Sequence, residues 1–76
     1  METVAQYIKR NRDALDMSID ELAFISGFPK KMILSWESAE ADPSRNNMLA
    51  LDVAFCAAKI VRDFRLNFEG LKNGES

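Results

Sequence analysis

The Gly27–Pro29 break constrains this chain most, because a helical pattern stops there and resumes directly afterwards. Gly27 can adopt the positive φ of a tight turn. Phe28 is pushed out of the helical region by the proline that follows it, and Pro29 suits the first turn of a new helix. The break therefore predicts two short helices that meet at a glycine, one ending near Ser26 and the other running to residue 37 or 38.

Two capping boxes mark helix starts before this break. Thr3 and Gln6 have the required spacing, as do Ser18 and Glu21, and in such a box each side chain satisfies a backbone amide. The first box predicts a helix that ends near residue 15 or 16, and the second predicts a helix that ends near Ser26. Strand-like alternation is found nowhere in the chain, so the sequence predicts an all-α fold.

The last third of the chain predicts a long helix. Asp42 is a good N-cap and Pro43 a good first helical residue. No glycine or proline follows from residue 44 to residue 69, and an unbroken helix there would be roughly 39 Å long. We expect either a break near residues 57–59 or a helix that projects to meet a second subunit. Together these signals predict a compact four- to five-helix domain over residues 1–69, with a C-terminal helical segment over 44–69 and a flexible tail over 70–76.

Composition excludes several classes of protein. The chain has 76 residues, enough for one small domain, and its apolar runs fall far short of the roughly 20 residues that span a membrane. The N-terminus has no apolar block behind a basic start, so we expect no secretory signal and a cytoplasmic protein. The single cysteine, Cys56, precludes an internal disulfide, and its apolar surroundings suggest a buried residue rather than a reactive thiol.

The sequence has few of the residues that catalysis commonly requires. The chain has no histidine and one cysteine, and the three glycines form no phosphate-binding loop. Neither a metal site nor a nucleophile–base pair can be assembled from what remains. We therefore expect no enzyme, no metal, no cofactor and no small-molecule ligand.

Three residues around the break carry a resemblance to a known family. Ala23 is small, Gly27 follows four residues on, and Ile33 follows six residues later, while "DELA", "SWE" and a distal "DP" surround them. In this pattern residues 8–55 resemble the phage-repressor-like (XRE/Cro-type) helix-turn-helix DNA-binding family. The resemblance implies a helix-turn-helix over residues 18–37, in which the third helix crosses close above Ala23 and Ile33 packs back between the helices.

The resemblance also implies an ion pair. Arg12 stands late in the first helix and Glu37 ends the third, the two positions that pair in the family. The alternative is that both are ordinary surface charges. Trp36 lies one turn beyond Met32 and Ile33, so we expect it in the core rather than on a stacking surface.

The resemblance places the helix over residues 29–37 in the major groove of double-stranded DNA, with its N-terminal residues facing the bases. Lysine can donate to guanine, and leucine can contact a thymine methyl. The candidate base-reading residues are Lys30, Lys31, Leu34 and Ser35. Alternatively, the two lysines are a solvated pair on a helix face. The candidate phosphate contacts are the side chains of Lys9, Arg10 and Arg45 and the backbone amides near Ile19 and Asp20.

Several positions depart from the family pattern. Ile19 replaces a glutamine, Pro29 replaces a serine or threonine cap, Ala39 replaces a glycine, and Glu40 lies in a loop that is often basic. The net charge is −2, and acidic residues are interspersed with the basic ones: Asp13, Asp16, Asp20 and Glu21. We therefore expect modest non-specific DNA binding with a shallow salt dependence.

The C-terminal segment has more apolar residues than a four-helix core can bury. Met48, Leu51 and Phe55 are expected to face the helix-turn-helix. The excess predicts a homodimer interface made of Ile60, Val61, Phe64, Leu66 and Phe68. The alternative is a fifth helix folded back onto its own core. Phe24 either extends an apolar patch or belongs to the core.

Two functions follow as hypotheses. The first is a sequence-specific transcriptional regulator of bacterial or phage type, repressor- or Cro-like, that binds operator DNA as a dimer. The second is a protein-interaction module on the same fold, antitoxin- or anti-repressor-like, that binds DNA little. Ile19, Glu40 and the negative net charge favour the second, whereas Lys30 and Lys31 favour the first.

Overall fold

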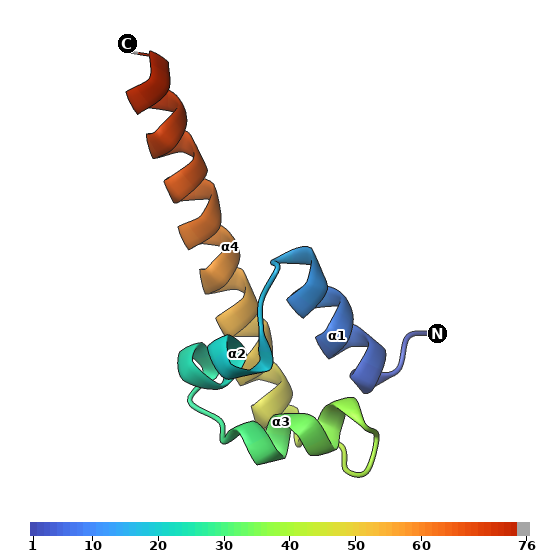
Figure 1. The fold of residues 1–76 in the computed structure, drawn as a ribbon. Coiled ribbons are helices and arrows are strands. Elements are labelled where there is room, and N and C mark those ends of the chain that lie inside the picture. Colours follow the sequence, from blue (N-terminus) through green and yellow to red (C-terminus); the bar gives the residue numbers. More distant parts are fainter. Residues whose placement is uncertain (75–76) are drawn as a thin grey trace.

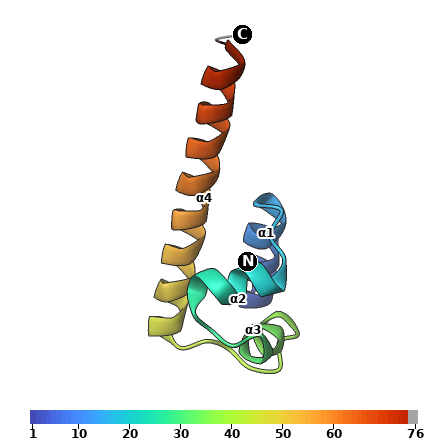
Figure 2. The ribbon, with the colours of Figure 1, turned by 60° about the vertical axis from the view of Figure 1, so that its left-hand side comes forward.

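The computed structural model describes residues 1–74, and side chains as far as residue 67. Within that part the chain forms four helices and no strand, α1 (Val4–Ala14), α2 (Ile19–Ser26), α3 (Lys30–Glu37) and α4 (Arg45–Gly74) (Figure 1). The all-α prediction is confirmed. The helices α1, α2 and α3 gather beside the first half of α4, whose second half extends beyond them (Figure 2).

Both predicted capping boxes are present. Gln6 donates its amide to the Thr3 hydroxyl at 3.1 Å, and Thr3 donates its own to the Gln6 side chain at 2.9 Å. Ser18 and Glu21 exchange the equivalent bonds at 3.1 and 3.3 Å. Gly27 has φ 78° at the end of α2, the left-handed conformation predicted for it.

Two predicted helix starts are wrong in detail. Pro29 has extended backbone (φ −61°, ψ 141°) and precedes the first residue of α3 rather than belonging to its first turn. The start of α4 is set by Ser44 and not by Asp42 and Pro43. The Ser44 hydroxyl accepts the amide of Asn47 at 3.2 Å, so this residue acts as the N-cap.

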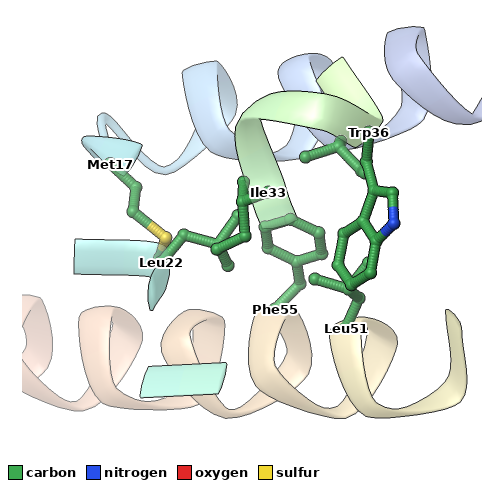
Figure 3. Close-up of a cluster of buried hydrophobic side chains, with 7 residues drawn as sticks. Met17, Leu22, Ile33, Trp36, Leu51 and Phe55 are labelled. Carbon is green, nitrogen blue, oxygen red and sulfur yellow. The ribbon is translucent and has the colours of Figure 1, made fainter. Parts of the chain in front are cut away.

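The core lies where all four helices meet. Ile8 of α1, Leu22 of α2, Ile33 of α3 and Phe55 of α4 are almost wholly excluded from solvent. Met17, Trp36 and Leu51 complete the cluster (Figure 3). Trp36 is 3% exposed, which confirms its predicted place in the core. Ala23 and Ile19 pack against the cluster from α2.

Helix α4 is continuous through residues 57–59, so the predicted alternative of a break there is wrong. A fifth helix folded back onto the core is also absent from the described residues. The helix runs to Gly74, five residues beyond its predicted end, and residues 75–76 lie outside the described part. Cys56 is exposed on this helix, which corrects the expectation of burial.

Among the described residues, no helix combines the length and the apolar character needed to cross a membrane.

Candidate nucleic-acid interface

An ion pair between α1 and α3 fixes the orientation of α3. The Nη2 of Arg12 donates to Oε1 of Glu37 at 2.9 Å, so the predicted pair is present. The two side chains are 19% and 5% exposed, which makes the pair largely buried. The Nη1 of Arg12 also donates to the carbonyl of Met17 at 3.0 Å. One guanidinium thus joins α1, the turn before α2, and the last residue of α3.

Helix α3 has one buried side and one exposed side. Ile33, Trp36 and Glu37 face the core. The four candidate base-reading residues cover an arc of about 140° next to this buried side, with Lys30 at its edge, two turns before Glu37: Lys30, Lys31, Leu34 and Ser35. Both lysines are exposed, Leu34 is 43% exposed, and the Ser35 hydroxyl donates to the carbonyl of Met32 at 2.7 Å. Lys30, Lys31 and Leu34 are therefore accessible on one face of α3, and Ser35 is half-buried at its edge.

Lys30 is engaged by a carboxylate that the sequence did not suggest as its partner. Its Nζ lies 3.1 Å from Oδ1 of Asp20, and both side chains are more than half exposed. Asp20 lies in the first turn of α2, where its negative charge interacts favourably with the helix dipole. The two residues are ten apart in sequence, so no helical spacing could have indicated the contact. Lys31 makes no ion pair with any residue of the described chain.

The candidate phosphate contacts fall into two groups. Lys9 and Arg45 are exposed, and Arg45 occupies the first turn of α4, where a cation opposes the helix dipole. The amides of Ile19 and Asp20 take no part in the capping box and stand at the start of α2. The Ile19 side chain itself packs on the core, so only its amide is a candidate.

Arg10 is already paired within α1 and its N-terminal residues. Its Nε and Nη2 donate to the two carboxylate oxygens of Glu2 at 2.6 and 2.9 Å, and its guanidinium lies 5.9 Å from the centre of the Tyr7 ring. These hydrogen bonds lower the pKa of Glu2. The pair is exposed, so a phosphate could still displace the carboxylate.

Glu40 places a negative charge beside the candidate base-reading residues. A hollow of about 770 Å³ between α3 and the start of α4 is lined by Lys31, Ser35 and Glu40, among others. Ala39 precedes Glu40 and has φ 64°, a conformation that favours glycine. The Glu40 amide nevertheless donates to the carbonyl of Ser35 at 3.0 Å, which closes α3 as a glycine cap would.

A second polar contact joins α1 to α4. The Tyr7 hydroxyl donates to Oδ1 of Asp52 at 2.8 Å, and the Tyr7 ring meets Phe55 edge-on at 6.0 Å. Burial, followed by the hydrogen bond to the Asp52 carboxylate, raises the pKa of Tyr7 to about 12. The contact holds the first half of α4 against α1, before α4 extends beyond the core.

The titration of Tyr7 can be followed directly, because it is the single tyrosine of the chain. We expect its absorbance at 295 nm to change with a midpoint near pH 12. An unfolded tyrosine titrates near pH 10, so the neutral phenol stabilises the fold fully below pH 10. That contribution is lost as the pH rises through about 12. The Asp52→Asn variant should lower the midpoint in part, because burial remains, and a midpoint of 10 in the native protein would contradict the contact.

The predicted dimer residues are exposed on the projecting half of α4. Ile60, Val61, Phe64 and Leu66 are all more than half exposed, whereas the side chain of Phe68 lies outside the described residues. At 3.6 residues per turn, Leu66 lies about 120° or more from Ile60 and Phe64 around the helix. Leu66 therefore lies on a different face of α4 from Ile60 and Phe64, and the predicted dimer residues do not form a single stripe. Phe24 is 88% exposed on α2 and is not part of the core.

The chain matches no protein-family model, no curated protein and no solved structure. Among the described residues, no group of His, Cys, Asp and Glu side chains is placed to hold a metal ion. The case for a function therefore depends on the geometry of α3 and its surroundings.

Proposed function

We propose that this protein is a sequence-specific, DNA-binding transcriptional regulator of the repressor- or Cro-like helix-turn-helix type, which binds double-stranded DNA with α3 in the major groove. The observation that carries the proposal is the buried Arg12–Glu37 pair. It holds α3 against α1 with Lys30, Lys31 and Leu34 exposed and Ser35 half-buried beside them. A rigidly held, exposed helix is what major-groove reading requires.

In this proposal the lysines donate to guanine O6 and N7, and Leu34 contacts a thymine methyl. Lys9, Arg45 and the amides at the start of α2 contact phosphates and set the register of the helix in the groove. An arginine in the first turn of α4 weakens the helix, so its presence is better explained by a bound anion than by stability. Two copies would present two such helices to adjacent turns of the duplex.

Acidic neighbours set the expected strength of binding. Asp20 competes with DNA for Lys30, and Glu40 lies on the hollow beside Lys31. Both carboxylates repel phosphate. We therefore expect the protein to bind non-specific DNA weakly and to bind its operator much more tightly.

The second candidate is a protein-interaction module on the same fold. The observation that favours it is Glu40 on the hollow between α3 and α4, with the exposed Met32 beside it. A basic segment of another protein would fit such a surface better than a phosphate would. The two candidates differ in what Lys30 and Lys31 do, and this difference can be measured.

The test is selection of duplex DNA from a random pool at low salt, with the Lys30→Glu/Lys31→Glu variant in parallel. We expect the wild-type protein to enrich a motif with two related half-sites about 10 base pairs apart, and the variant to enrich none. A matched control, Lys59→Glu/Arg65→Glu, makes the same change of charge on α4 away from α3. It should retain the motif.

Equal and weak enrichment by all three proteins would contradict DNA reading and favour the protein-interaction module. Loss in both variants would show that binding depends on overall charge and not on the α3 face.

A further inference from the structure

Helix α4 has a second apolar side that no described part of the chain covers. Val53, Ile60 and Phe64 are each about two-thirds exposed or more. With 3.6 residues per turn, Ile60 and Phe64 lie within about 20° of Val53 around the helix. The core residues Leu51 and Phe55 lie about 160° from Val53. The helix is thus apolar on two opposite sides, and only one of them packs on its own core.

The exposed side has the spacing of a coiled-coil seam. Val53, Ala57, Ile60 and Phe64 follow one another at intervals of four, three and four residues, as a and d positions do. This set is called the α4 stripe below. The flanking e and g positions are also apolar at Leu49, Ala54, Cys56 and Val61, and Asp63 is the one charged residue among these five.

We propose that the α4 stripe binds the α4 stripe of a second copy of this chain, with the two helices parallel. The direction rests on the proposed DNA-binding function. Helix α3 and the start of α4 lie at one end of the molecule, and the free end of α4 lies at the other (Figure 1). Parallel pairing brings both α3 helices to the same end, where they can contact one duplex. Antiparallel pairing would direct them to opposite ends.

A groove beside the stripe fits the same arrangement. It has a volume of about 410 Å³ and is lined by Ile25 of α2 and by Leu49, Val53 and Ala54 of α4. In a parallel pair, a g residue faces the e residue five positions later on the other helix. In the proposed pair, Leu49 of the partner subunit lies opposite Ala54, which lines the groove but is itself only 6% exposed, so the leucine fills the groove above it. This contact accounts for a leucine that is 59% exposed in the single chain.

Helix α2 also exposes a large apolar side chain, Phe24. It precedes Ile25 on α2 and is 88% exposed. Soluble monomers rarely expose a continuous apolar patch larger than roughly a few hundred Å², and larger patches mark interaction sites. The groove adjoins the α4 stripe, because Val53 and Ala57 of the stripe line it together with Ile25 of α2. Because the surface is built from one chain and has little charge, an identical surface complements it without an unpaired charge in the seam.

The direction of pairing is tested by disulfide cross-linking of the full chain without DNA. Val53→Cys and Phe64→Cys are each made in a Cys56→Ser background and oxidised separately and as a mixture. In a parallel dimer each variant cross-links to itself, because identical positions face each other. In an antiparallel dimer only the mixture gives a cross-linked product, since position 53 would face position 64, and this result would overturn the proposal.

The location of the interface is tested by sedimentation of the same chain. Ile60→Lys places a charge in the stripe and should convert a dimer to a monomer with unchanged circular dichroism. Leu66→Lys, the matched control on another side of α4, should leave the dimer intact. A wild-type protein that remains monomeric up to its solubility limit would overturn the proposal, as would equal effects of the two variants. A parallel dimer that selects no DNA would refute the proposed function and leave this inference standing.

Discussion

Replacing Arg12 with alanine is expected to lower the free energy of unfolding by about 3–5 kcal/mol. The change leaves the Glu37 carboxylate, whose side chain is 5% exposed, without the guanidinium 2.9 Å away. It also removes the donor to the carbonyl of Met17. The total stability of a domain of this size is on the order of 5–10 kcal/mol, so the variant should be partly unfolded at 37 °C. Urea unfolding followed by the fluorescence of Trp36 measures the loss.

The control for this prediction removes both charges. An Arg12→Met/Glu37→Leu variant fills the same space without an unpaired charge, and we expect it to recover most of the lost stability. The comparison separates the cost of an isolated buried carboxylate from the net contribution of the pair. A loss below about 0.5 kcal/mol for Arg12→Ala would mean that the pair behaves as a surface contact, which contradicts its burial.

The distinction matters for the proposed function. Replacing Arg12 and replacing Lys31 would both reduce the proposed DNA binding, but for different reasons. Loss of Arg12 would remove the ion pair that orients α3 on α1. Lys31 makes no ion pair in the described chain, so its loss would leave the fold intact. A binding defect in Lys30→Glu/Lys31→Glu with unchanged unfolding therefore indicates a direct contact. The same defect in Arg12→Ala indicates only that α3 must be held in place.

Local signals in the sequence predicted the parts of the fold that depend on local geometry. The Ser18–Glu21 box and Gly27 act within one turn of the chain, and the structure has both as predicted. The start of α4 was misplaced because Asp42 and Ser44 are both competent caps, and the choice between them depends on how the loop after α3 closes. The Glu40–Ser35 bond that closes it is not visible in composition or spacing.

The candidate site could be predicted only in part, for a similar reason. One exposed face of α3 follows from the spacing of Lys30, Lys31 and Leu34 along a helix. The Lys30–Asp20 contact depends on the crossing of α2 and α3, and no sequence pattern encodes that distance. The sequence does not decide whether α4 is continuous, because its length is compatible with both a break and a projecting helix. The structure has the projection, and the apolar stripe on it gives a physical reason for its length.

Phe55→Ala should be the most destabilising single substitution in α4, with a loss of about 3–5 kcal/mol. The side chain is 1% exposed and meets Tyr7 edge-on, so its removal leaves a cavity between α1 and α4. Phe64→Ala, on the opposite side of the same helix, is the matched control. Phe64 is 72% exposed in the single chain, and at low protein concentration its loss should change stability by less than about 0.5 kcal/mol.

The same pair of variants responds differently to protein concentration. A dimer that buries Phe64 gains stability by mass action, so the wild-type unfolding midpoint should rise with concentration and that of Phe64→Ala should rise less. Phe55→Ala should be less stable at every concentration, with the concentration dependence retained, because the α4 stripe is unchanged. Equal concentration dependence in wild type and Phe64→Ala would show that Phe64 stays exposed and that the length of α4 serves some other contact. The two phenylalanines, nine residues apart, thus separate what holds α4 to its own core from what α4 offers to a second copy.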